Sequence, residues 1–399
     1  MKICVASIHP RLLSGQIEGV VALAKSLERL GHEVKLVSVF GDELTNARPE
    51  RPDEGSGQGL APRLLQIGAV LKKIVAEARC SDVLQLNLPT PAFAGVADVL
   101  RELAHRPTVV GFEAHLANVP GALRRVPMAP EFYLPRVLVN NGIVARLAPR
   151  RAERYIVSSE WQRTELERLG FASERISVIP NLVIEDKLKP WAKDEARADL
   201  GLPDGPLIGY IGHYHDVKGH DVLIEALRIM RANLPAGSSA PRLVMAWSGI
   251  GSPQRVQAQL ARAGLRDAVI QLPKVNVGQF FSALDVLALP YRFTLGQAAF
   301  PGTVLEAMAV GVPLVTSRLP LLEEIVEHEG TGLLAEPGDA ASLAGQISRL
   351  LADRGLAEQV GAQAKSVYRE RFDPQRVAQE YVAAYEEVLA REARLLQPA

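Results

Sequence analysis

The stretch FPGTVLEAMAVGVP occupies residues 300–313. Pro301 and Gly302 are typical of a helix start, and Gly311 ends the helix just before a strand. Glu306 lies one turn inside this otherwise apolar helix, where a carboxylate is costly to bury unless it accepts hydrogen bonds. Paired ribose hydroxyls are good donors for such a carboxylate. A structural cap for nearby backbone is the alternative, and the spacing leaves both open.

Short β-branched runs alternate with helical patterns on both sides of this stretch. The first half predicts strands at residues 3–8, 33–39, 82–86, 108–112, 155–158 and 175–179. The second half predicts strands at residues 206–212, 242–246, 269–272, 286–289, 313–316 and 331–334. Strand-helix-strand order indicates a parallel sheet with helices on both faces, so the fold class is α/β, built twice.

The length of 399 residues fits two domains. The polar segment 185–194 has no strong periodicity and suits a connector, so we expect the domain boundary near residue 190. Residues 375–395 predict an amphipathic helix, whose apolar face needs a cover.

The composition excludes several function classes. Lysine plus arginine and aspartate plus glutamate number 45 each, so no bulk attraction to nucleic acid is implied. Cys4 and Cys80, the only cysteines, suggest neither a disulfide framework nor a metal site. The first apolar run is too short for a signal sequence, and no segment reaches the roughly 18 apolar residues of a membrane span. We therefore expect a cytoplasmic protein.

Two turns between strand and helix could receive a phosphate. Gly15 would let the backbone approach a ligand, but neither G-x-G-x-x-G nor a P-loop is present, and a plain turn glycine is the alternative. Lys218 could supply a positive charge at the start of the second half, and a solvated lysine is the alternative there.

Taken together, these segments resemble the retaining glycosyltransferases of the GT-B fold, in the large family four group. The resemblance extends over nearly the whole chain. It is carried by residues 15–18, 31–34, 178–181, 212, 218–219, 282–290, 305–313, 324–326 and 330–334.

The resemblance implies two Rossmann-like domains with parallel sheets facing across a cleft. Residues 1–190 would bind the acceptor, 191–374 would bind the nucleotide sugar, and 375–399 would form a helix that crosses back to the N-terminal domain. Carried over by position, Lys218 would contact the donor phosphates, Glu306 the ribose, and the Gly15 amide the pyrophosphate. The predicted donor-binding set is Gly15, His213, Lys218, Gln297, Thr303, Val304 and Glu306.

The predicted catalytic residues are His115 and Lys218. His115 matches a position near the acceptor and the reacting sugar, although a histidine at a strand end is often only a buried hydrogen-bonded group. Lys218 would stabilise the charge that builds on the departing diphosphate.

Three positions depart from the family pattern, all on the donor side. His213 stands where the family usually has an arginine, Ala298 replaces a glutamate with Gln297 as the nearest polar substitute, and Pro320-Leu321 replaces a Gly-Gly pair. No Asp-x-Asp metal motif occurs, so the expected reaction needs no metal.

The expected function is retaining transfer of a hexose-type sugar from a UDP- or GDP-type donor to a small-molecule, glycan or lipid-linked acceptor. The alternative, motivated by His213 and Ala298, is a catalytically silent nucleotide-binding protein acting as a partner or regulator. The arginine-rich stretch 121–154 suggests peripheral contact with an anionic membrane or acceptor, and a solvated helix face is the alternative.

Overall fold

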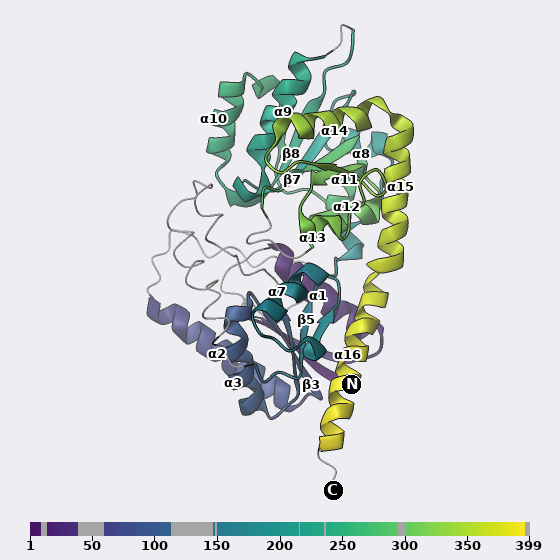
Figure 1. Ribbon diagram of the computed structural model, residues 1–399. Coiled ribbons are helices and arrows are strands. Elements are labelled where there is room, and N and C mark those ends of the chain that lie inside the picture. The colour runs from purple at the N-terminus through teal and green to yellow at the C-terminus, as the bar shows by residue number, and fades with distance from the viewer. Residues whose placement is uncertain are drawn as a thin grey trace. The chain divides into compact units, whose positions relative to one another are not determined.

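The computed structural model describes residues 1–8, 14–38, 60–112, 147, 150–214, 216–234, 237–293 and 300–395. By internal packing these residues form two compact units (Figure 1). Unit 1 holds the described residues of Met1–Leu182 together with the C-terminal segment that begins at Pro374. Unit 2 begins at Val183 and ends at Asp373, so the polar connector 185–194 lies within it.

Unit 1 is built on a six-stranded parallel sheet in the order β2-β1-β3-β4-β5-β6. Its strands are β1 (Lys2–Ser7), β2 (Glu33–Ser38), β3 (Val83–Leu88), β4 (Thr108–Phe112), β5 (Arg154–Val157) and β6 (Ile176–Val178). Its helices are α1 (Ser14–Arg29), α2 (Leu60–Arg79), η1 (Pro91–Phe93), α3 (Ala94–Ala104), α7 (Glu160–Arg168), η2 (Ser173–Arg175) and α16 (Pro374–Leu395).

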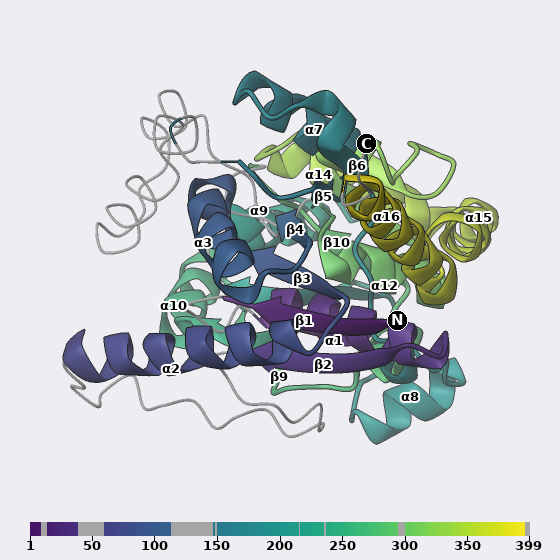
Figure 2. The same ribbon diagram turned by 90° about the horizontal axis from the view of Figure 1, so that it is seen from below.

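Strand β3 explains how this sheet is covered on both faces. All six of its residues are buried, as in a central strand of a parallel sheet. Leu84, Leu86 and Leu88 join the hydrophobic cluster formed with α2 and α3, and the alternation of side chains turns Gln85 and Asn87 to the other face. Figure 2 shows this sheet between α3 and α16.

The last helix, α16, completes unit 1. Its residues Val377, Ala384 and Val388 are buried, and it packs against α1. The Tyr385 hydroxyl donates to Oε1 of Gln85 at 3.2 Å, in a buried setting. The apolar face of this amphipathic helix is therefore buried within unit 1, as its sequence pattern predicts.

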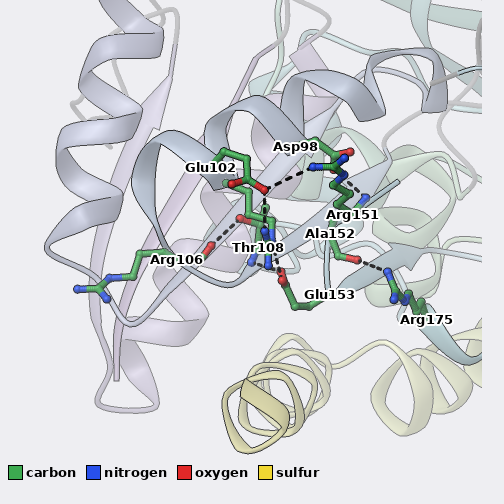
Figure 3. Close-up of polar contacts among 9 residues, drawn as sticks. Asp98, Glu102, Arg106, Thr108, Arg151, Ala152, Glu153 and Arg175 are labelled. Atoms are coloured by element: carbon green, nitrogen blue, oxygen red, sulfur yellow. Dashed lines mark hydrogen bonds and ion pairs between the residues drawn. The ribbon is translucent and has the colours of Figure 1, made fainter. Parts of the chain in front are cut away.

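A polar network joins α3, β4 and the start of β5 (Figure 3). The Glu153 carboxylate accepts from Nε of Arg101 and from the backbone N–H of Thr108, both at 2.6 Å. Asp98 accepts from the backbone N–H of Arg151 at 2.9 Å. The Glu153 carboxylate thus accepts from a guanidinium on α3 and from the first amide of β4, and so connects the helix to the sheet.

Unit 2 contains a second six-stranded parallel sheet, in the order β12-β11-β10-β7-β8-β9. Its strands are β7 (Leu207–Tyr214), β8 (Arg242–Gly251), β9 (Val269–Leu272), β10 (Val286–Leu289), β11 (Leu314–Ser317) and β12 (Leu333–Ala335). Its helices are η3 (Glu185–Lys187), α8 (Lys193–Asp199), η4 (Asp216–Lys218), α9 (His220–Ala232), α10 (Pro253–Ala263), η5 (Arg266–Ala268), α11 (Val277–Ser282), α12 (Gly302–Val310), α13 (Pro320–Glu323), α14 (Ala340–Ala352) and α15 (Arg354–Arg371).

The two parallel sheets confirm the predicted α/β fold class. Each predicted strand is present, and most bounds differ by one or two residues. The largest difference is at β8, which ends at Gly251 rather than at residue 246, because its pairing with β7 continues past a register shift between Gly212 and Tyr214. None of the helices within the described ranges is long and apolar enough to span a membrane.

Strand order in unit 2 reverses between β7 and β10. From β7 the chain adds β8 and β9 on one side, and β10, β11 and β12 then follow on the other. In open parallel sheets such a switch point leaves a crevice outside the carboxyl ends of the two strands, where ligands bind. In unit 2 the carboxyl ends of β7 and β10 lead to residues 216–220 and 290–293.

Candidate functional site

The turns that follow β7 and β10 are in close backbone contact. The backbone N–H of Arg292 donates to the carbonyl of Val217 at 3.0 Å. Gly219 has a φ of 69°, and a Cβ there would lie 1.9 Å from the carbonyl oxygen of Pro290. Only glycine permits this approach without a shift of the main chain, and the approach places Lys218 beside Tyr291.

Tyr291 is the centre of the group. Its side chain is 3% exposed, and Nζ of Lys218 lies 4.7 Å from the centroid of its ring. An ammonium at this distance from a ring face is attracted by the negative charge of the π system. Burial lowers the pKa of Lys218 to about 8, so the ammonium sits in a partly dry setting where an anionic ligand is bound more strongly than in water.

Helix α12 supplies the carboxylate. Thr303 and Glu306 are three residues apart and so share one helix face, whereas Val304, Leu305 and Ala307 are fully buried in the core. Burial raises the pKa of the Tyr291 hydroxyl, the charge of Glu306 raises it further, and a hydrogen bond with Thr303 opposes the rise. Lys218 therefore lies against the ring of Tyr291, and the charge of Glu306 acts on its hydroxyl.

An ion pair lies next to this group. Nη2 of Arg292 is 2.6 Å from Oδ2 of Asp221, in the first turn of α9, and each side chain is 27% exposed. The pair joins the residue after Tyr291 to the helix after Lys218. It supports the position of both turns.

His213 is held by the neighbouring strand. Its Nδ1 forms a hydrogen bond with the hydroxyl of Ser248 on β8, and its carbonyl accepts from the Tyr210 hydroxyl at 2.7 Å. The ring thus has a fixed partner at the carboxyl end of β7. Its predicted contact with the donor stays a prediction.

The remaining predicted residues fall in three places. Val304 packs in the core, and its backbone N–H donates to the Pro301 carbonyl at 2.9 Å; its predicted contact with the donor stays a prediction. Gly15 lies in the first turn of α1, after β1 in unit 1. Gln297, Ala298 and His115 lie outside the described residues, as do nearly all of residues 121–154.

The sequence reading missed Tyr291 and Arg292. Both lie just beyond β10, after Pro290. The signal that could have found them is their position at the carboxyl end of a strand that pairs with β7, the strand that precedes Lys218. Within the described ranges, no three His, Cys, Asp or Glu side chains group as metal ligands.

Comparison with known families accounts for both halves of the chain. Residues 14–187 match the model of Glycosyltransferase Family 4, and residues 192–367 match that of Glycosyl transferases group 1. The two models divide the chain much as its two units do. The chain belongs to the group 1 glycosyltransferases, and its fold is GT-B.

Individual relatives support this assignment. A D-inositol 3-phosphate glycosyltransferase of Xylanimonas cellulosilytica is 28% identical over 385 residues, which is 88% of this chain and 86% of the relative. A protein of the same name from Acidothermus cellulolyticus is 31% identical, over 59% of this chain and 53% of its own length. The match thus spans about half of that relative.

A solved structure agrees with the fold. Anabaena HepE in complex with UDP-glucose has a TM-score of 0.71 and 21% identity, over 98% of this chain and all of that chain. At this identity the likeness concerns the fold.

Proposed function

We propose that this protein is a retaining glycosyltransferase that moves a hexose from a nucleotide diphosphate sugar to an acceptor without a metal ion. The observation that carries the proposal is the contact of the Lys218 ammonium with the Tyr291 ring at the switch point of unit 2, where the charge of Glu306 acts on the hydroxyl of the same tyrosine. A cation and a carboxylate in one place match the two ends of a nucleotide diphosphate, its phosphates and its ribose.

In this proposal Lys218 offsets the negative charge that develops on the leaving diphosphate, which is a contribution made more strongly in the transition state than in the ground state. Glu306 accepts hydrogen bonds from the ribose and fixes the nucleotide. The N–H groups of Gly302 and Thr303, at the start of α12, offer further donors to an anion. Gly15 and His115 remain predicted contacts from unit 1.

The relatives supply the first substrates to try. UDP-glucose is our first donor, because HepE is complexed with it. A small polyol phosphate is our first acceptor, because two relatives are named for D-inositol 3-phosphate. A cytoplasmic location completes the proposal.

The test separates an enzyme from a silent binder. Calorimetry with UDP and GDP, each with and without EDTA, measures binding, and release of glucose or transfer to inositol phosphate measures turnover. We expect binding and turnover in the wild type, with turnover lowered about 100-fold or more in Lys218→Ala. The matched control is Lys193→Ala, since Lys193 is paired with Asp285 elsewhere in unit 2 at 2.5 Å. Nucleotide binding without any turnover would favour the silent regulator.

A further inference from the structure

Tyr291 has a partner at each of its two ends. Its ring face lies beneath the Lys218 ammonium, and its hydroxyl shares a hydrogen bond with Thr303. A buried tyrosine ordinarily needs one polar partner for its hydroxyl. Here the ring face has a charged partner as well, and both partners come from residues of the proposed donor site.

We propose that Tyr291 is a positioning residue, whose ring face holds the Lys218 ammonium in place for the donor diphosphate while Thr303 fixes the ring. The inference rests on the proposed function for the identity of the ligand, a nucleotide diphosphate. Lysine has a flexible four-carbon stem, and its ammonium carries no planar fork to orient it. A fixed ring that attracts the ammonium reduces the rotamers that must be lost when the phosphate binds.

Charged groups also lie on the elements that adjoin Lys218. They include Asp216 on η4, His213 on β7, His220 and Asp221 on α9, Arg292 after β10, and Glu306 on α12. Asp221 is paired with Arg292. Burial lowers the pKa of Lys218 to about 8.

The experiment compares Tyr291→Phe, which keeps the ring, with Tyr291→Met and Tyr291→Leu, which fill the space without one. The first measurement is the pKa of Lys218 without nucleotide, from the 13C signal of its labelled Cε. That signal is identified by its loss in Lys218→Met. The second is UDP affinity by calorimetry from pH 7 to 10, a range above the second phosphate pKa of about 6.

We expect the Phe variant to keep a Lys218 pKa near 8. Loss of the ring removes an attraction that favours the charged form, while the apolar side chain keeps the site dry. The pKa should then fall by about 0.4 to 1.5 in the Met and Leu variants, and UDP affinity at pH 7.5 should fall roughly 3- to 30-fold. An unchanged or higher pKa in those variants would overturn the proposal.

Two further outcomes are decisive. If neither the Met nor the Leu variant unfolds cooperatively, the Tyr291→Phe variant decides. A wild-type Lys218 pKa and UDP affinity in that variant would support the role of the ring, and a large loss of UDP affinity would overturn the proposal. If no nucleotide binds the wild type, the proposed function fails. The titration of Lys218 still decides whether the ring holds its ammonium, because it needs no ligand.

Discussion

Substitution of Gly219 by alanine tests the backbone contact on which the site in unit 2 is built. Two costs add. A residue other than glycine at a φ of 69° costs about 1–2 kcal/mol. The new Cβ would also lie 1.9 Å from the Pro290 carbonyl oxygen, and because this atom belongs to the main chain, relief requires a shift that costs about another 1–3 kcal/mol.

Gly264 provides the matched control. It also has a left-handed conformation, with a φ of 67°, but a Cβ there would meet nothing within 4 Å. We expect Gly264→Ala to lower the free energy of unfolding by about 1–2 kcal/mol and Gly219→Ala by about 2–5 kcal/mol. Urea unfolding measures both. The difference between the two variants isolates the contact with Pro290.

The functional consequence follows from the neighbour of Pro290. A shift of this carbonyl moves Tyr291 relative to Lys218, so UDP affinity should fall about tenfold or more in Gly219→Ala, in line with an attraction of up to about 2 kcal/mol, and stay at the wild-type value in Gly264→Ala. Equal unfolding free energies in the two variants would refute the reasoning, and so would wild-type UDP binding in Gly219→Ala.

Three more predictions concern single side chains. Lys218→Met should raise the free energy of unfolding by about 1–3 kcal/mol at pH 7, because a pKa lowered from 10.5 to about 8 means that folding disfavours the ammonium. The gain in stability is full below pH 8, where Lys218 is charged in both the folded and the unfolded protein. It should vanish as the pH rises to 10.5, because the lysine then loses its charge in the unfolded protein as well. Urea titrations at several pH values measure this dependence. Glu153→Gln should lower the free energy of unfolding in urea by about 1–3 kcal/mol. Glu102→Gln changes a side chain that is 55% exposed and should lower it by under about 0.5 kcal/mol. Equal losses in the two variants would contradict the network of Figure 3. Tyr385→Phe leaves the buried Gln85 oxygen without its donor and should cost about 1–2 kcal/mol by the same assay, whereas a neutral change would mean that water replaces the hydroxyl.

The fold was predictable because its strands are short, apolar and separated by strong helical patterns. A strand such as β3, buried on both faces, leaves an uninterrupted hydrophobic run that periodicity detects. The ends of the strands were harder to predict than the strands themselves. For example, β7 and β8 continue through a register shift that depends on how the two strands pair. Pairing is a tertiary property, and local pattern carries little information about it.

The candidate site was predictable only where a motif carried it. Lys218 and Glu306 stand in recognisable segments; Lys218 lies against the Tyr291 ring, and the charge of Glu306 acts on the hydroxyl of that tyrosine. Tyr291 itself follows a core strand and reads as one more buried aromatic. Its importance depends on β7 lying beside β10, and those two strands are separated in sequence by two intervening strands of the same sheet.

In the proposed function, His213 stands where the family usually has an arginine, and this changes how the charge of the donor is met. The His213 ring is hydrogen-bonded to Ser248, and in this proposal Lys218 supplies positive charge to the donor. A buried ammonium attracts an anion more strongly than an exposed one, because the attraction between unit charges grows as the effective dielectric constant falls. Burial and the Tyr291 ring supply that dry setting. The same burial brings the pKa of Lys218 to about 8, which ties donor binding to pH: affinity for UDP should hold up to about pH 8 and decline above it, as the ammonium loses its proton.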